Sequence, residues 1–143
     1  MDKSRVLFVC IHNSARSQMA EALLNHFYGD YFQAESAGLE PGKLNPIAVA
    51  AMADIGIDIS KKTTRGVFDL YKAGMMYKYV VTVCDEASAE RCPLFPSATK
   101  TLHWSFEDPA SFKGSDTEKL QKTILVRDKI KSTIAAWVHE LNP

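Results

Sequence analysis

The sequence lacks long hydrophobic runs. The longest apolar stretch near its N-terminus spans only residues 6 to 11. Such a run is shorter than the core of a signal peptide and far shorter than the roughly 20 residues of a membrane-spanning helix. We therefore expect a cytoplasmic protein that does not associate with membranes.

An excess of charge of either sign is also missing. The 17 Lys and Arg residues balance 17 Asp and Glu residues. Proteins that bind nucleic acids or membrane surfaces usually carry clustered basic residues, so neither role has support. With 46% hydrophobic and 24% charged residues, the composition is that of a soluble globular protein. A length of 143 residues predicts one domain, residues 1–143, and we expect a monomer.

Cysteine is scarce. The chain has three, Cys10, Cys84 and Cys92, which are too few and too scattered for a disulfide scaffold. A reducing cytoplasm keeps such residues as thiols unless a reaction oxidises and reduces them in turn. The histidines at positions 26, 103 and 139 form no ligand-like cluster, so we expect no metal site and no other cofactor.

Two kinds of apolar segment alternate along the chain. Short apolar or β-branched runs predict strands over residues 6–10, 31–37, 79–84 and 100–104. Apolar residues at helical spacing predict helices over 17–29, 46–56 and 116–141, and a short helix within 63–76. The predicted N-caps are Asn45 and either Asp116 or Thr117. This alternation predicts an α/β fold, a single domain with a four-stranded parallel sheet and helices on both faces.

Cys10 and Cys84 both end predicted strands. Parallel strands bring their carboxyl ends to one edge of the sheet, and ligands of such folds bind beyond that edge. The predicted topology therefore places two thiols at the candidate site.

The loop after the first strand suits an oxyanion. Five residues separate Cys10 from Arg16, namely Ile11, His12, Asn13, Ser14 and Ala15. That length is enough to wrap backbone N–H groups around a tetrahedral anion, and the next helix points its positive end at the same place. The guanidinium of Arg16 matches two oxygens of an oxyanion. The loop and Arg16 form the predicted substrate-binding set.

Cys10 is the predicted nucleophile, because the thiolate is the reactive form of cysteine and positive groups favour it. Ser17 is placed to donate a hydrogen bond to the sulfur, and Asn13 and Ser14 are placed to brace the loop. The pattern alone also fits a buried strand cysteine without a chemical role.

A family resemblance extends this interpretation. The stretch CIHNSARSQMAEALL resembles the loop and first helix of thioredoxin-coupled arsenate reductases with the low-molecular-weight tyrosine phosphatase fold. The resemblance continues through SAGLEPGKLNPIAVAAMADIGIDIS, VVTVCDEASAERCP, HWSFEDPA and VRDKI, and so covers nearly the whole chain. The C-x5-R-S element fits the phosphatases equally well. The SQMAE continuation and the two later cysteines favour the reductases.

The resemblance implies a relay of three thiols. Reduction of arsenate takes two electrons, so two thiols must end as a disulfide, whereas a phosphatase needs one cysteine and a water. In the family, one cysteine attacks arsenic, a second attacks the first sulfur as arsenite leaves, and a third closes a disulfide with the second. Carried over, these are Cys10, Cys84 and Cys92, with thioredoxin as reductant. Glutaredoxin or a small thiol would complete a similar cycle.

The step from Cys84 to Cys92 implies motion. Eight residues of helix would span about 12 Å, whereas bridged cysteines need Cα atoms within roughly 7 Å. We expect this segment to unwind or loop out when the disulfide forms, which changes the surface that a reductase meets. Without the resemblance, Cys84 also fits plain core and Cys92 a loop cysteine of no consequence.

Asp108 is the predicted acid. Pro109 follows it and fixes the local chain. A carboxylic acid here would protonate a leaving oxygen, and its carboxylate would assist deprotonation of Cys84. A turn residue before proline is the alternative. In related phosphatases a tyrosine follows the Asp-Pro pair, so Ala110 counts against a tyrosine phosphatase.

Two loop residues depart from many relatives, which carry Gly and Cys where this chain has His12 and Ala15. A glycine at the first position suggests an unusual backbone angle there. We expect a structural or solvent-facing role for His12 and none for Ala15 in the relay.

Some family members bind potassium through an asparagine, a glutamate, a serine and an aspartate. Asn13, Glu21 and Ser36 match, but Arg65 stands at the aspartate position. A cation there repels potassium and is placed to pair with Glu21. We therefore expect activity that does not depend on potassium.

The leading hypothesis is an arsenate reductase for arsenic detoxification, with phosphate and sulfate as oxyanion mimics. The alternative is a low-molecular-weight tyrosine phosphatase that forms a phosphocysteine at Cys10. A third is a redox sensor or an oxyanion-binding protein without turnover.

Overall fold

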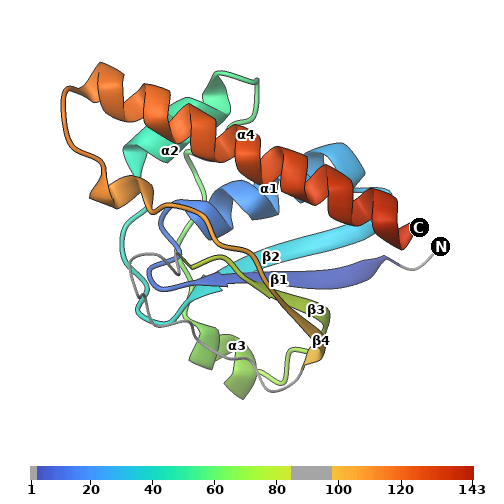
Figure 1. Cartoon of the computed structure of the whole chain (residues 1–143). Coiled ribbons are helices and arrows are strands. Elements are labelled where there is room, and N and C mark those ends of the chain that lie inside the picture. Colours follow the sequence, from blue (N-terminus) through green and yellow to red (C-terminus); the bar gives the residue numbers. More distant parts are fainter. Residues whose placement is uncertain (1–2, 85–97) are drawn as a thin grey trace.

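Four parallel strands form one sheet in the order β2-β1-β3-β4 (Figure 1). The computed structural model describes residues 3–84 and 98–143. The strands are β1 (Ser4–Cys10), β2 (Phe32–Gly38), β3 (Tyr77–Thr82) and β4 (Ala98–His103). Helices α1 (Arg16–Tyr28), α2 (Pro46–Ala53) and α4 (Asp116–Leu141) lie on one face, α3 (Val67–Lys72) lies on the other, and a short 3-10 helix, η2, spans Pro109–Ser111. The predicted single-domain α/β fold with helices on both faces is confirmed.

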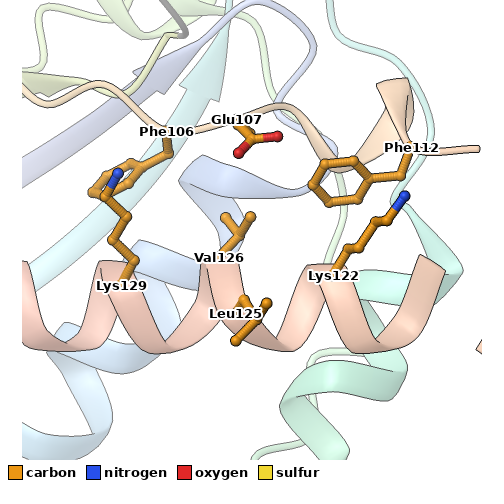
Figure 2. A pocket seen from close by; sticks show the side chains of 7 residues that line it. All are labelled: Phe106, Glu107, Phe112, Lys122, Leu125, Val126 and Lys129. Carbon is orange, nitrogen blue, oxygen red and sulfur yellow. The ribbon is translucent and has the colours of Figure 1, made fainter. Parts of the chain in front are cut away.

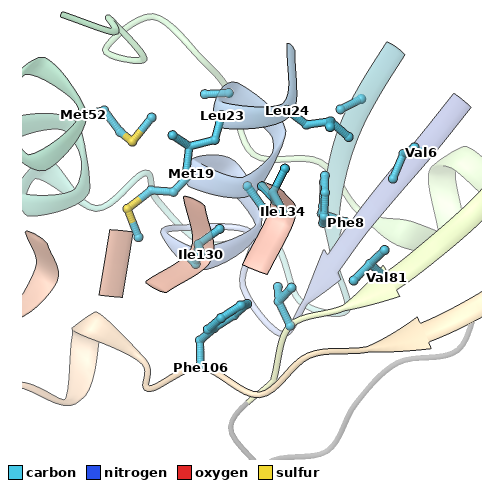
Figure 3. Packing of buried hydrophobic residues seen from close by; sticks show 14 of the residues in the cluster. Val6, Phe8, Met19, Leu23, Leu24, Met52, Val81, Phe106, Ile130 and Ile134 are labelled. Carbon is cyan, nitrogen blue, oxygen red and sulfur yellow. The ribbon is translucent and has the colours of Figure 1, made fainter. Parts of the chain in front are cut away.

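The larger hydrophobic core lies between the sheet and the three helices on one face (Figure 3). Its fully buried members include Val6 and Phe8 of β1, Val81 of β3, Met19, Leu23 and Leu24 of α1, and Ile130 and Ile134 of α4. The alternate β1 residues Leu7 and Val9 face a smaller cluster with Val67 of α3. Because β1 is covered on both faces, it reads as a continuous apolar run.

The strand register sets the edge where the candidate site lies. Cys10, the last residue of β1, pairs with Gly38 of β2, and Val9 pairs with Thr82 of β3. The backbone N–H of Val83 still donates to the Val9 carbonyl at 2.9 Å, although β3 ends at Thr82 and not at the predicted residue 84. The chain leading to Cys84 therefore leaves the sheet directly beside Cys10.

The cap of α4 differs from the prediction. The N-cap is Ser115, and not Asp116 or Thr117. Ser115 Oγ accepts the Glu118 backbone N–H at 3.1 Å, and the Glu118 carboxylate accepts the Ser115 N–H at 3.3 Å. This reciprocal pair is a capping box, whose Ser-x-x-Glu spacing is visible in the sequence.

Two alanine substitutions on α4 test the position of the core. Ile130→Ala should lower the free energy of unfolding by about 2–5 kcal/mol, because the side chain is fully buried. Leu125→Ala, on the same helix with 69% of the residue exposed, should change it by less than about 0.5 kcal/mol. Urea unfolding measures both free energies, and equal losses of stability in the two variants would contradict this placement of the core.

Candidate active site

Hydrogen bonds from the segment that follows β2 hold the loop between β1 and α1. The carbonyls of Cys10, Ile11, His12 and Ser14 accept backbone N–H groups of Leu39, Glu40, Gly42 and Asn45 at 2.8 to 3.1 Å. In a trans peptide the N–H points away from the carbonyl of the preceding residue. The N–H groups of residues 11, 12, 13 and 15 therefore turn toward the inside of the loop, where they form a concavity suited to an anion.

The Cys10 sulfur lies inside this loop, and the residue is 2% exposed. It accepts the Asn13 backbone N–H at 3.1 Å and lies 3.0 Å from Ser17 Oγ. Asn13 Nδ2 donates to the same Ser17 oxygen at 2.8 Å, which leaves the serine O–H available to donate to the sulfur. The predicted contact between Ser17 and Cys10 is confirmed, and both donors stabilise a thiolate.

Asn13 holds the loop from within. Its backbone lies in the left-handed region with φ of 55°, a conformation that asparagine tolerates better than most residues. Its side-chain oxygen accepts Gln18 Nε2 at 3.1 Å and the Arg65 backbone N–H at 2.9 Å. Gln18 also donates to the Thr63 carbonyl at 3.1 Å. Gln18 was not predicted as a site residue, and the sequence signal for it is its place in the SQMAE stretch that carries the family resemblance.

His12 does not have the unusual backbone angle suggested for it. In the described part of the chain, the non-glycine residues with positive φ are Asn13 and Asn142. The exposed imidazole of His12 lies outside the loop, with Nδ1 3.0 Å from the Glu40 carbonyl oxygen. This agrees with a structural or solvent-facing role. Ala15 is buried and precedes α1 as its N-cap residue.

Arg16 and Asp108 come together from distant parts of the sequence. Arg16 is 3% exposed, and its Nη1 donates to the Phe106 carbonyl at 3.2 Å. Its Nη2 lies 3.6 Å from Asp108 Oδ2. The other Asp108 oxygen accepts the Ala110 N–H at 3.0 Å and caps η2. Asp108 therefore caps a turn before Pro109, which was the alternative to an acid role, and its carboxylate also lies beside the Arg16 guanidinium.

Cys84 is fully buried two residues beyond the end of β3. Cys10 ends β1 and Cys84 follows the neighbouring parallel strand β3, so both residues lie at the same edge of the sheet. Cys92 and the predicted change of shape over residues 85–91 lie outside the described residues.

A buried carboxylate, Glu21, lies behind the loop. It accepts Ser36 Oγ at 2.9 Å, pairs with Lys62 Nζ, and lies 3.6 Å from Arg65 Nη2. The predicted pair of Arg65 and Glu21 is confirmed, whereas Lys62 was not predicted. Burial, and to a smaller extent the nearby Arg65 charge, lowers the pKa of Lys62.

The residues that match the potassium ligands of some family members already have partners within this chain. Two cations already compensate Glu21, and the Asn13 side-chain oxygen accepts two hydrogen bonds. The cavity beside Glu21, about 320 Å³, is lined by Lys61, Lys62 and Arg65. A third cation would be repelled there.

Residues 3–84 and 98–143 contain no cluster of three or more His, Cys, Asp or Glu side chains arranged to hold a metal ion. In the same ranges, no helix is both long enough and apolar enough to cross a membrane.

Comparison with known proteins agrees with this geometry. The sequence profile of the low molecular weight phosphotyrosine protein phosphatases matches residues 5–143. The chain belongs to this family. It is 42% identical over 136 residues to an arsenate reductase of Shouchella clausii strain KSM-K16, a match that covers 94% of both chains. The resemblance found in the sequence is confirmed.

Solved structures of this family extend the comparison. An arsenate reductase in the phosphate binding state has a TM-score of 0.78 and 28% identity, covering 96% of this chain and 98% of that one. A thioredoxin-dependent arsenate reductase of Corynebacterium glutamicum has a TM-score of 0.62 and 26% identity, covering 94% of this chain and 61% of that one.

Replacing Lys62 tests whether its ammonium takes the place of potassium. Lys62→Gln should lower the free energy of unfolding by about 1–3 kcal/mol, because a buried carboxylate loses a partner. The variant should then be more stable in KCl than in NaCl at equal ionic strength, whereas the parent protein should not distinguish the salts.

Lys61→Gln, at the exposed neighbouring lysine, is the control and should behave as the parent. Thermal unfolding in the two salts measures the effect. Greater stability of the parent in KCl, or a Lys62→Gln variant indifferent to the salt, would contradict the assignment.

Proposed function

We propose that this protein reduces arsenate to arsenite with a relay of three thiols. The observation that carries the proposal is the buried Cys10 sulfur, which accepts the Asn13 N–H within the loop, with a second buried cysteine, Cys84, two residues beyond the adjacent strand. A hydrolase needs the first thiol only. A relative that is 42% identical to this chain, over 94% of both chains, carries the name arsenate reductase.

In the first step the loop binds arsenate. The N–H groups of residues 11, 12, 13 and 15 and the guanidinium of Arg16 contact its oxygens, and donors that are fixed in advance cost little reorganisation. The Cys10 thiolate attacks arsenic, a sulfur–arsenic bond forms, and an arsenic–oxygen bond breaks. Asp108, whose Oδ2 lies 3.6 Å from Arg16 Nη2, in its protonated carboxylic acid form gives its proton to the departing oxygen and becomes a carboxylate. Phosphate and sulfate bind in the same loop as mimics.

In the second step the Cys84 thiolate attacks the Cys10 sulfur. A Cys10–Cys84 disulfide forms, and the electron pair of the broken sulfur–arsenic bond stays on arsenic, which falls from As(V) to As(III) and leaves as arsenite. The position of the buried Cys84, just beyond the strand that pairs with the Cys10 strand, supports this step.

In the third step Cys92 attacks Cys84, which restores the Cys10 thiolate and leaves a Cys84–Cys92 disulfide. A dithiol reductase of the thioredoxin type then reduces that disulfide, and the thioredoxin-dependent relative supports this choice of partner. The cycle requires a reducing compartment, so we place the protein in the cytoplasm and expect it to act as a monomer.

Phosphatase activity through a phosphocysteine at Cys10 is the second candidate. The Cys10 to Ser17 geometry and the family name favour it. The chain has Ala110 where the related phosphatases place a tyrosine. We therefore expect at most slow phosphate ester hydrolysis.

Cys84→Ser separates the two activities. It should abolish arsenate-dependent NADPH oxidation in the presence of thioredoxin and thioredoxin reductase, because the second electron-donating thiol is gone. Hydrolysis of para-nitrophenyl phosphate should persist at the level of the parent. Parallel assays with glutathione and glutaredoxin identify the reductant.

Cys10→Ser is the matched control, since it should abolish both reactions. Unchanged arsenate reduction by Cys84→Ser would refute the relay. Anion binding without turnover in the parent protein would instead favour an oxyanion-binding protein.

Arg16→Lys should lower kcat/KM for arsenate about 100-fold, because lysine keeps the charge and loses the planar pair of donors. Arg5→Lys, at the opposite end of β1, is the control and should leave the rate within about twofold. Steady-state kinetics measure this, on variants whose circular dichroism spectra match that of the parent. Similar rates for both variants would show that Arg16 does not bind the substrate.

A further inference from the structure

A groove lies between α4 and the segment that carries Asp108 (Figure 2). Its volume is about 320 Å³, which is the lower end of the range for small-molecule sites. Its apolar lining is Phe106, Phe112, Leu125 and Val126. Leu125 is 69% exposed in the middle of a helix, so the groove offers apolar surface that no part of the described chain covers.

Two ammonium groups stand at the ends of the groove. Figure 2 shows Lys129 at the Phe106 end and Lys122 at the Phe112 end. Lys122 Nζ lies 5.9 Å from the centroid of the Phe112 ring. Residues seven apart share a helix face, about 10.5 Å along the axis. Glu107 is the single acidic residue of the lining, so the lining carries a net positive charge.

These features define the ligand. Two phenylalanine rings and an exposed leucine suit a flat apolar body, and the lysines suit one anionic group on it. A volume of about 320 Å³ holds a small ring system.

The groove shares a wall with the candidate active site. Phe106 lines the groove with its ring and accepts Arg16 Nη1 with its carbonyl at 3.2 Å. Asp108, two residues further on, pairs with the same guanidinium. A ligand that shifts Phe106 therefore shifts the Arg16 donors that face the oxyanion.

We propose that this groove binds a small aromatic carboxylate, and that its occupancy is coupled through Phe106 to oxyanion binding at the Cys10 loop. The two sites are separate, so the binding half of this proposal stands whether or not the protein reduces arsenate.

Calorimetric titration of the full chain with 1-naphthoate tests the binding. We expect a Kd below about 1 mM, and naphthalene-1-carboxamide, which has nearly the same shape without the charge, should bind at least about fivefold more weakly. Leu125→Glu and the double variant Lys122→Gln/Lys129→Gln should weaken naphthoate binding at least about fivefold, and Glu107→Gln should strengthen it.

Lys131→Gln is the matched control. Lys131 is an exposed α4 lysine that lies over the ring of Phe27, away from the groove, and its replacement should leave binding unchanged. Absence of naphthoate binding would overturn the proposal. If phosphate displaces naphthoate and Leu125→Glu does not weaken its binding, naphthoate binds at the Cys10 loop. That result would also overturn the proposal.

Phosphate titrations with and without saturating naphthoate test the coupling. The Kd for phosphate should change at least about twofold, and the Kd for naphthoate should change by the same factor when phosphate is saturating. Naphthoate binding that depends on Leu125 but leaves the phosphate Kd unchanged would overturn the coupling.

Discussion

The candidate site depends on the close crossing of the Cys10 loop over the end of β2. Carbonyls of the loop are held by backbone N–H groups of the segment after β2, and this turns the intervening N–H groups inward. Gly38 permits the crossing, because a Cβ at that position would lie 2.8 Å from both the Asn13 nitrogen and the Ile11 oxygen. The anion-binding concavity is thus fixed by backbone packing before any ligand arrives, which is the arrangement that electrostatic stabilisation requires.

Charge balance behind the loop follows from the same packing. Asn13 ties the loop to Gln18 of α1 and to the backbone at Arg65, and the chain that carries Arg65 also brings Lys62 to the buried Glu21. A buried carboxylate without partners would be costly. Here the chain supplies two cations of its own, Lys62 and Arg65, as partners of that carboxylate.

Local patterns predicted most of the fold, and distant contacts account for what was missed. The apolar run of β1 and the spacing of Ser17 from Cys10 placed strand, loop and donor correctly. The Ser-x-x-Glu spacing of Ser115 and Glu118 is a local signal for the α4 N-cap that the prediction did not use. Lys62 and Gln18 act through partners 41 and 45 residues away in the sequence, and no periodicity reports such pairs. The left-handed backbone conformation lies at Asn13 and not at His12, where the glycine of many relatives suggested it. The Asn13 side chain contacts both Gln18 and the backbone at Arg65, and these distant contacts are not visible in a local sequence pattern.

The same turn serves hydrolysis and reduction, so the chemistry is decided by what stands next to it. A phosphocysteine and a thiol–arsenic adduct place the same sulfur in the same ring of donors. They differ in the group that attacks next, which is water at the bound phosphorus or a thiol at the sulfur. The parallel register pairs Val9 with Thr82, and the chain continues from there to Cys84, a second buried cysteine at the same edge of the sheet. Reduction requires a thiol as the next nucleophile, and curated relatives that match most of this chain carry the name arsenate reductase.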